Sequence, residues 1–500
     1  MTVPELIDGT AVELGDNSRL NPAGRLFGED AICSVCPGLI EVDARPDDEI
    51  STVRIAHFSV QEYLESDRIL QHKAAPFRVR KLETDAEIAS ICLTYLLEPA
   101  LSRDSMEKYP LALYAAKTWH EHFRDGGKNT HARHQALRLF RSSRGEFENW
   151  VTIWNVDAYD GRKPSGKVPS PVYYASLLGL DLVLSKLLCE KPSGSAFSAI
   201  SPPEISDLVN AQGGEYGNAL QAASFEGYEK VVELLLDKGA DVNAQGGRHG
   251  NALQAASHNG HEKIAELLLD KGADANAQGG RHGNALHAAS LNGHEKVVEL
   301  LLDKSADANA QGGEYGNALQ AASFGGYEKV VELLLDKGAD VNAQGGDYGN
   351  ALQAASAYGR EKVVELLLDK GADVNAQGGI CGNALQAASR NGHEKVVEQL
   401  LDKGTDVNAQ GGRYGNALQA ASVYGHEKVD KGADVNAQGG DYGNALQAAS
   451  AYGREKVSSC CSVEGPHRNV QAEILCIGYP RGDSCPRICI ATHYSSTSAN

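Results

Sequence analysis

Apolar residues in the C-terminal two thirds of the chain follow helical spacings that glycine interrupts at short intervals. Leu220 and Ala223 lie three positions apart and share one face of a short predicted helix. Asn218 can cap the start of this helix with its side chain, and Gly227 can end it. The pattern therefore predicts a short helix with a single apolar face.

A second predicted helix follows from Glu229 to Asp237, and Gly239 supplies the left-handed residue that ends it. Its apolar stripe consists of Val232, Leu235 and Leu236 and is widened by Val231 and Leu234. Residues 240–249 are rich in turn formers and predict a projecting loop, which we call a finger. Because helices this short are not stable alone in water, their apolar faces must pack against neighbouring copies of the same pattern.

This two-helix pattern repeats along the chain. The string Gly-Asn-Ala-Leu-(Gln or His)-Ala-Ala-Ser begins at Gly217, Gly250, Gly283, Gly316, Gly349, Gly382, Gly415 and Gly443. The first six intervals are all 33 residues. Such a period predicts a linear stack of repeats that bury one continuous core.

The last interval, from Gly415 to Gly443, is 28 residues, because five residues of the second helix are missing after Val429. We expect this loss to rotate the following chain and to make the Gly443 repeat stack poorly. The repeat before the deletion should then leave an apolar end open to self-association or to a partner. The residues expected at that open end are Val396, Val397 and Leu400.

The period and the residue pattern of the repeats resemble those of the ankyrin repeat. Asn218-Ala219-Leu220-Gln221 stands where that family has Thr-Pro-Leu-His, and Gly239-Ala-Asp-Val-Asn-Ala244 matches its other signature. The resemblance covers Ser170 to Val457 and implies an α-solenoid. It also implies that His287, which restores the family's histidine, bonds a neighbouring loop.

Short elements are also predicted in the N-terminal third. Two apolar runs read as strands, Ser59 to Glu62 forms a capping box, and two amphipathic helices follow. The strands are predicted at Leu39–Val42 and Val53–Ala56, and the helices at Thr84–Leu96 and Leu111–Trp119.

Several strings of this region, among them Ile55-Ala-His-Phe-Ser-Val-Gln-Glu-Tyr-Leu64, resemble the winged-helix and helical segment after the NACHT NTPase module of fungal NOD-like receptor proteins. In that family the nucleotide site lies upstream, so the resemblance implies the C-terminal part of such a receptor.

We therefore predict a mostly α chain, with a winged-helix-like and helical segment followed by an ankyrin-repeat α-solenoid and an irregular tail. The predicted divisions are a poorly defined segment (1–29), the winged-helix-like and helical region (30–154), a linker (155–169), the repeats (170–457) and a tail (458–500) that we expect to be disordered. Within the repeats we expect a degenerate first repeat (170–190), an insertion (191–203), regular repeats from 217, a damaged repeat (415–442) and a partial one (443–457).

Charge and composition narrow the function classes. Asp and Glu number 66 against 47 Lys and Arg, for a formal net charge of −19, which disfavours nucleic acid as a partner. Neither a membrane-spanning run nor a signal peptide is recognisable, so we expect no membrane insertion and a cytoplasmic location, with the nucleus as an alternative. The ten cysteines are scattered, and reduced thiols are expected.

Motifs that carry catalytic chemistry are incomplete. Gly161 to Lys167 has the spacing of a phosphate loop, but Val168 replaces the hydroxyl residue that binds Mg²⁺. His261-Glu-Lys-Ile-Ala265 lacks the second histidine of a zinc protease motif. The weak candidate metal ligands are Cys33 and Cys36, and Cys476, Cys485, Cys489 and His493 in the tail. We predict a chain that is not an enzyme and has no cofactor and no metal.

Because no catalytic motif is complete, we look for function on the surface of the repeats. Across the repeats the scaffold hardly changes, while two places vary: the finger tip, which is the pair of residues before each repeat's first glycine, and the end of the first helix. In ankyrin proteins these positions face the groove that holds partners, and Tyr and Arg dominate binding hot spots. The partner-binding candidates are Tyr216, Arg248, His249, Arg281, His282, Tyr315, Tyr348, Arg413 and Tyr414. The alternative is that exposed tips vary freely.

We therefore predict a non-catalytic module that binds a protein or peptide in a fungal innate-immunity or incompatibility-type signalling context. The alternative is the C-terminal part of an ATP-dependent NACHT receptor whose NTPase module is encoded upstream.

Overall fold

The computed structural model is mostly helical, as predicted. It describes residues 3–14, 18–25, 40–43, 52–55, 62, 64–71, 78–126, 130–158, 161, 164, 166–189, 205–426, 433–434 and 436–452. These residues form two compact bodies. The first body comprises residues up to Ala355 together with Arg360–Asp373, and the second comprises Ser356–Gly359 and the residues from Val374 onward. No helix in the described ranges is long and apolar enough to cross a bilayer.

The first body begins with a helical region that carries two small sheets. Its elements are α1 (Val3–Gly9), β1 (Val12–Glu13), β2 (Arg19–Leu20), η1 (Pro22–Gly24), β3 (Ile40–Asp43), β4 (Thr52–Ile55), η2 (Asp67–Gln71), α4 (Lys81–Leu96), η4 (Arg103–Lys108), α5 (Ala112–Gly126), α6 (Thr130–Phe140) and α7 (Glu146–Ile153). Strand β1 pairs with β2 and β3 with β4, both antiparallel, with Val42 opposite Val53.

The N-terminal strands and helices form where they were predicted, but the second helix continues to Gly126, seven residues past the expected end at Trp119. The two expected strands are β3 and β4, and the two expected helices are α4 and α5. Helix α4 begins at Lys81, three residues before the expected Thr84, because Arg80 takes the extended conformation of the residue that precedes a helix. Ser59 of the expected capping box lies outside the described residues, as do Cys33, Cys36, the insertion at 191–203 and the tail.

Aromatic side chains join this region to the first repeat. Trp150 of α7 packs edge-on against Trp119 of α5 at 5.5 Å between ring centroids and against Tyr174 at 5.6 Å. Tyr174 lies on α8, the first helix of the degenerate repeat. Its hydroxyl donates to Asn155 Oδ1 at 2.8 Å, so part of the expected linker is bound to the repeats.

The helix pairs of the repeats follow α7. In the first body they are α8 (Pro171–Leu177) and α9 (Asp181–Cys189), the short α10 (Ile205–Val209), α11 (Ala219–Glu226) and α12 (Glu229–Asp237), α13 (Ala252–Asn259) and α14 (Glu262–Asp270), α15 (Ala285–Leu291) and α16 (Glu295–Asp303), α17 (Ala318–Gly325) and α18 (Glu328–Asp336), and α20 (Glu361–Asp369). Helix α19 (Ala351–Ala357) spans the division, and the second body contains α21 (Ala384–Asn391), α22 (Glu394–Asp402), α23 (Ala417–Tyr424) and α24 (Ala445–Ala451).

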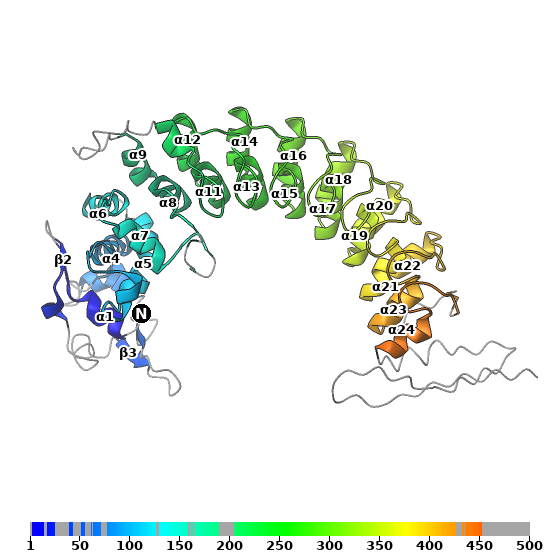
Figure 1. Cartoon of the computed structure of the whole chain (residues 1–500), viewed down its shortest axis with the longest axis horizontal. Coiled ribbons are helices and arrows are strands. Elements are labelled where there is room, and N and C mark those ends of the chain that lie inside the picture. The colour runs from blue at the N-terminus through cyan, green and yellow to red at the C-terminus, as the bar shows by residue number, and fades with distance from the viewer. Residues whose placement is uncertain are drawn as a thin grey trace, which may run out of the picture. The chain divides into compact units, whose positions relative to one another are not determined.

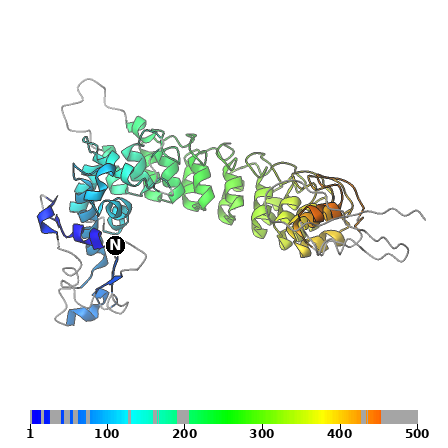
Figure 2. The same cartoon turned by 60° about the horizontal axis from the view of Figure 1, so that its bottom comes forward.

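Within the first body the repeats form two helix layers. Helices α11, α13, α15 and α17 lie side by side, and α12, α14, α16 and α18 form a second layer on one side of them (Figure 1). A second view shows the same order of pairs (Figure 2). In α12 the buried residues are Val231, Val232 and Leu235, while Leu234 and Leu236 are half-buried. The centre of the apolar stripe is therefore shifted from the one predicted, because Leu236 lies at the edge of the packed face.

The departure from the family pattern at Gln254 has a structural reason. Asn251 Oδ1 accepts from Gln254 N at 2.8 Å, and Gln254 Oε1 accepts from Asn251 N at 2.9 Å, which closes a capping box. The same Gln side chain donates through Nε2 to Ala277 O at 2.9 Å and Gly283 O at 3.0 Å in the next finger. One glutamine thus starts its own helix and holds the neighbouring finger.

The glycine pair in each finger allows adjacent fingers to nest. Gly247 has a φ of +60°, and a Cβ on it would lie 2.1 Å from the carbonyl of Tyr216. A side chain at this position would therefore collide with the preceding finger. The close approach is also stabilised by hydrogen bonds, since Arg248 N donates to Glu215 O at 3.0 Å.

The second body corrects the prediction of a broken stack. Gln419 Nε2 donates to Ala437 O at 3.0 Å and Gly443 O at 2.6 Å, the same contacts that intact repeats make. Ala448 of α24 belongs to a buried cluster with Ala420 and Val423 of α23. The finger and the first helix therefore continue past the deletion, because their contacts do not pass through the second helix.

The prediction of an open apolar end is also wrong. Val396, Val397 and Leu400 of α22 are 0 to 2% exposed. The residues around the deletion itself, 427–432, lie outside the described ranges.

Candidate functional site

The finger tips of the first body form a continuous edge in which outward and inward side chains alternate. The first residue of each tip is exposed, as Arg248 and Arg281 are, and the second is turned over the end of a first helix. Backbone bonds join successive tips: Arg281 N donates to Arg248 O at 3.3 Å. The inward residues are Tyr216, His249, His282, Tyr315 and Tyr348, of which only His249 is fully buried.

The inward tip residues stack with the ends of the first helices in two aromatic rows. The first row runs Tyr216, Phe225, His249, His258, His282, with 4.6 to 4.9 Å between successive ring centroids. The second row runs Tyr315, Phe324, Tyr348, with spacings of 4.8 and 5.6 Å. Leu291 occupies the helix-end position between the rows. Each row is a strip of aromatic rings, and all of these side chains except the buried His249 are half-buried.

Charged residues flank the rows. Arg281 Nε lies 3.1 Å from Glu314 Oε2, and both side chains are largely exposed. An exposed pair of this kind contributes at most about 1 kcal/mol to stability. The charges therefore line the strip as groups that water or a partner can reach.

The second body carries a comparable aromatic group. The guanidinium of Arg390, at the end of α21, lies 5.5 Å from the ring centroids of both Tyr414 and Tyr424. The two tyrosine hydroxyls are 2.9 Å apart. A pocket of about 170 Å³ opens beside this group, lined by Arg413, Tyr414, Val423, Tyr424, Tyr442 and Tyr452.

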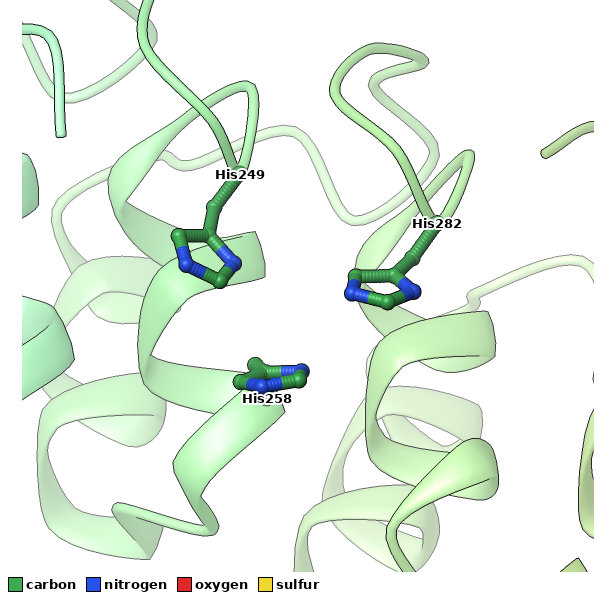
Figure 3. A group of neighbouring side chains, drawn as sticks. All are labelled: His249, His258 and His282. Atoms are coloured by element: carbon green, nitrogen blue, oxygen red, sulfur yellow. The ribbon is translucent and has the colours of Figure 1, made fainter. Parts of the chain in front are cut away.

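Three histidines gather within the first row (Figure 3). His249 and His282 come from adjacent fingers, and His258 comes from the end of α13. Burial is the main cause that lowers the pKa of His249 to about 3 and that of His282 to about 4, and it also lowers the pKa of His258. The three rings are therefore uncharged at neutral pH.

The nine predicted contact residues occupy three places. Five of them, Tyr216, Arg248, His249, Arg281 and His282, lie along the first row. Tyr315 and Tyr348 lie in the second row, and Arg413 and Tyr414 belong to the second body. His249 and Tyr414 are 4% and 6% exposed, so these two side chains support the surface more than they project from it.

Sequence reasoning missed the helix-end partners of these tips, which are Phe225, His258, Phe324, Arg390 and Tyr424. A signal was present, because the end of the first helix is the other place that varies between otherwise constant repeats.

The remaining motifs serve the scaffold. His287 Nε2 lies 2.9 Å from Ala310 O of the next finger, which confirms its predicted role. His261 of the incomplete protease motif lies 2.8 Å from Phe225 O in the preceding repeat. Lys167 of the phosphate-loop string is exposed, and the next helix begins only at Pro171.

Comparison with known proteins identifies the repeats. Residues 220–312, 253–345 and 312–378 match the family described as ankyrin repeats (3 copies), and residues 383–412 match the single ankyrin repeat. Ankyrin repeats are therefore present in this chain, as predicted.

Two individual proteins show further similarity. A Monascus ruber protein named "Azaphilone pigments biosynthesis cluster protein L" is 42% identical over 257 residues, which is 48% of this chain and 53% of that protein. The chain thus spans about half the length of this curated relative. The crystal structure of the human ASB11 ankyrin repeat domain is 25% identical and covers 47% of this chain and 97% of that chain, with a TM-score of 0.39.

Proposed function

We propose that this protein is a non-catalytic interaction module whose aromatic rows and charged tips bind a protein or peptide partner. The observation that carries the proposal is the first row, in which five stacked rings lie beside Arg248 and Arg281. Half-buried aromatic rings supply contact area with little loss of side-chain entropy, and arginine adds directional bonds.

The scaffold favours binding without rearrangement. The tips of the first row are held by backbone bonds from Arg248 and Arg281 to the preceding tip, and Gln254 holds the finger of the next repeat. A site on a rigid support loses little entropy when a partner docks. The net charge of −19 continues to favour a protein partner over nucleic acid.

The proposed setting is fungal innate-immunity or incompatibility-type signalling in the cytoplasm, with residues 30–154 as the winged-helix-like and helical region. The antiparallel pair β3 and β4 fits the wing of the proposed winged-helix-like region, and the similarity to a Monascus ruber protein fits the fungal part of this setting. The second candidate is the C-terminal part of an ATP-dependent NACHT receptor with an upstream NTPase module, of which the β3 and β4 pair would be part of the winged-helix region.

The experiment is a peptide-display selection on the full chain, followed by affinity measurements of the selected peptides. We expect Arg248→Ala, Arg281→Ala and Tyr348→Ala each to weaken binding by about tenfold. The matched controls are Lys296→Ala and Lys329→Ala, because these exposed lysines lie on second helices away from the tips. Peptides that lose affinity with the controls and not with the tip variants would contradict the proposal.

A further inference from the structure

The structure assigns a metal site to the histidine group of the first row: we propose that His249, His258 and His282 bind one divalent transition-metal ion of the zinc class, with one ring nitrogen each. One nitrogen of every ring lies within 4.8 Å of one nitrogen of each other ring. The ring centroids are 4.9 Å apart for His249 and His258, and also for His258 and His282. The rings converge from two fingers and one helix end (Figure 3).

The spacing suits a small ion after a modest adjustment. Zinc–nitrogen bonds of about 2.0 to 2.1 Å in a tetrahedral site place ligand nitrogens about 3.3 Å apart. The nitrogens must therefore approach one another by up to roughly 1.5 Å, which rotations about the side-chain bonds supply. Two ligands sit at finger tips that neighbouring tips hold in place, so the backbone need not move.

The ring nitrogens have capacity for a ligand bond. In the described part of the chain, both ring nitrogens of His249 and Nδ1 of His282 are buried without a hydrogen-bond partner. Buried polar atoms of this kind are rare, because leaving them unpaired costs free energy. A metal ion would satisfy one nitrogen of each ring.

His258 is the one ring with a competing contact. The Asn292 side-chain amide donates to His258 Nδ1 at 3.0 Å and also to Ala288 O. Nδ1 accepts this bond through its lone pair and can exchange it for the ion, with the ring proton on Nε2, while Asn292 keeps its bond to Ala288 O.

The chain itself shows that packing does not require histidine here. The equivalent positions in the second row are Tyr315, Phe324 and Tyr348, whose rings also contact one another and offer no nitrogen. Three imidazoles, with no carboxylate or thiolate in the set, suit zinc, copper, nickel or cobalt over magnesium or calcium. Three protein ligands also leave a position for water.

The test uses the full chain, freed of metal by a chelator and of any polyhistidine tag, and titrated calorimetrically with ZnCl₂. The three variants are His249→Tyr, His258→Phe and His282→Tyr, each of which installs the residue that the second row carries. His393→Tyr is the matched control, because Tyr327 occupies the equivalent position in another repeat and His393 Nε2 contacts Ala357 O, outside the histidine group. Thermal unfolding of every variant without zinc checks that the fold is kept.

We expect micromolar zinc binding at one site that each variant weakens by at least about tenfold and that His393→Tyr leaves unchanged. With Co²⁺ in place of zinc, the visible absorption bands of the ion should appear in the wild-type chain and weaken in His258→Phe. Wild-type binding that all three variants retain, binding that His393→Tyr weakens equally, or no binding below millimolar zinc would each overturn the proposal.

Discussion

At the scale of single residues, the glutamine that replaces the family's histidine is the main connector of the stack. Gln320 Oε1 accepts from Asn317 N at 2.8 Å, and its Nε2 donates to Gly349 O at 2.8 Å and to Ala343 O at 3.2 Å. His287 makes a comparable bond to the next finger in its own repeat. The two residue types are therefore interchangeable where they can reach the same carbonyls.

Gln320→Ala should lower the free energy of unfolding by about 1 to 3 kcal/mol, because it leaves buried carbonyls without their donor. His287→Gln is the conservative control and should stay within about 0.5 kcal/mol at neutral pH. Urea midpoints of the two variants and the wild type check the ordering. Equal midpoints for Gln320→Ala and the wild type would show that the side chain does not connect the repeats.

Single residues also determine how the stability of the fold depends on pH, and His120 of α5 provides a test. Burial lowers the pKa of His120 to about 4, and the nearby charge of Arg124 acts in the same direction. The unfolded chain, with a histidine pKa near ~6.5, therefore binds the proton first as the pH falls. The contribution of this residue to stability is complete above about pH 6.5 and is lost between about pH 6.5 and 4.

Between pH 7 and pH 5 the free energy of unfolding of His120→Gln should fall by about 1 to 2 kcal/mol less than that of the wild type. Urea unfolding of the wild type and the variant at both pH values measures this difference. If both proteins lose the same unfolding free energy between pH 7 and pH 5, groups other than His120 cause the acid sensitivity.

At the scale of elements, the second helices bury one narrow face against their neighbours. In α18 Leu334 is fully buried, while Leu335 beside it is only half-buried. The same pair of environments recurs in the other complete second helices, where one leucine stands in the place of Leu334. This helix therefore allows the same substitution to be compared in two environments.

Leu334→Ala should destabilise the chain by about 2 to 5 kcal/mol, since it leaves a cavity between layers. Leu335→Ala in the same helix should destabilise the chain clearly less. The finger-tip variant Tyr348→Ala should also destabilise it less than Leu334→Ala. Urea midpoints decide the order. A larger effect at Leu335 would mean that the buried face has been assigned wrongly.

The sequence predicted these elements closely because glycine and asparagine mark the ends of the helices. Asn251 and Gly260 bound α13 as caps, so periodicity and capping agree on its extent. The aromatic rows could be predicted only in part. The contact of His249 with His258 and His282 depends on which tip residue turns inward, and the repeat period does not determine that.

At the scale of the whole chain, the repeats of each body are connected by two separate sets of contacts. First helices and fingers make one set, and second helices make the other. The deletion after Val429 removes residues from the second set only, and the bonds of Gln419 keep the first set intact. The prediction of a broken stack failed because it treated the helix pair as a single rigid element.

We expect the amides of α24 to be protected from hydrogen exchange, with Ala448 and Ala449 at least about tenfold slower than in an unfolded chain. Gln419→Ala should remove much of this protection while leaving α21 unchanged. Exchange of α24 at the unfolded rate in the wild type would restore the idea that the stack ends at the deletion.

Partners should bind along the finger tips and the ends of the first helices. This binding can be mapped by hydrogen exchange of the full chain, with and without a peptide obtained by selection. We predict slower exchange at tips such as Arg248–His249 and Arg281–His282, and no change in second helices such as α14 and α18. Slower exchange confined to the second helices, with the tips unchanged, would contradict it.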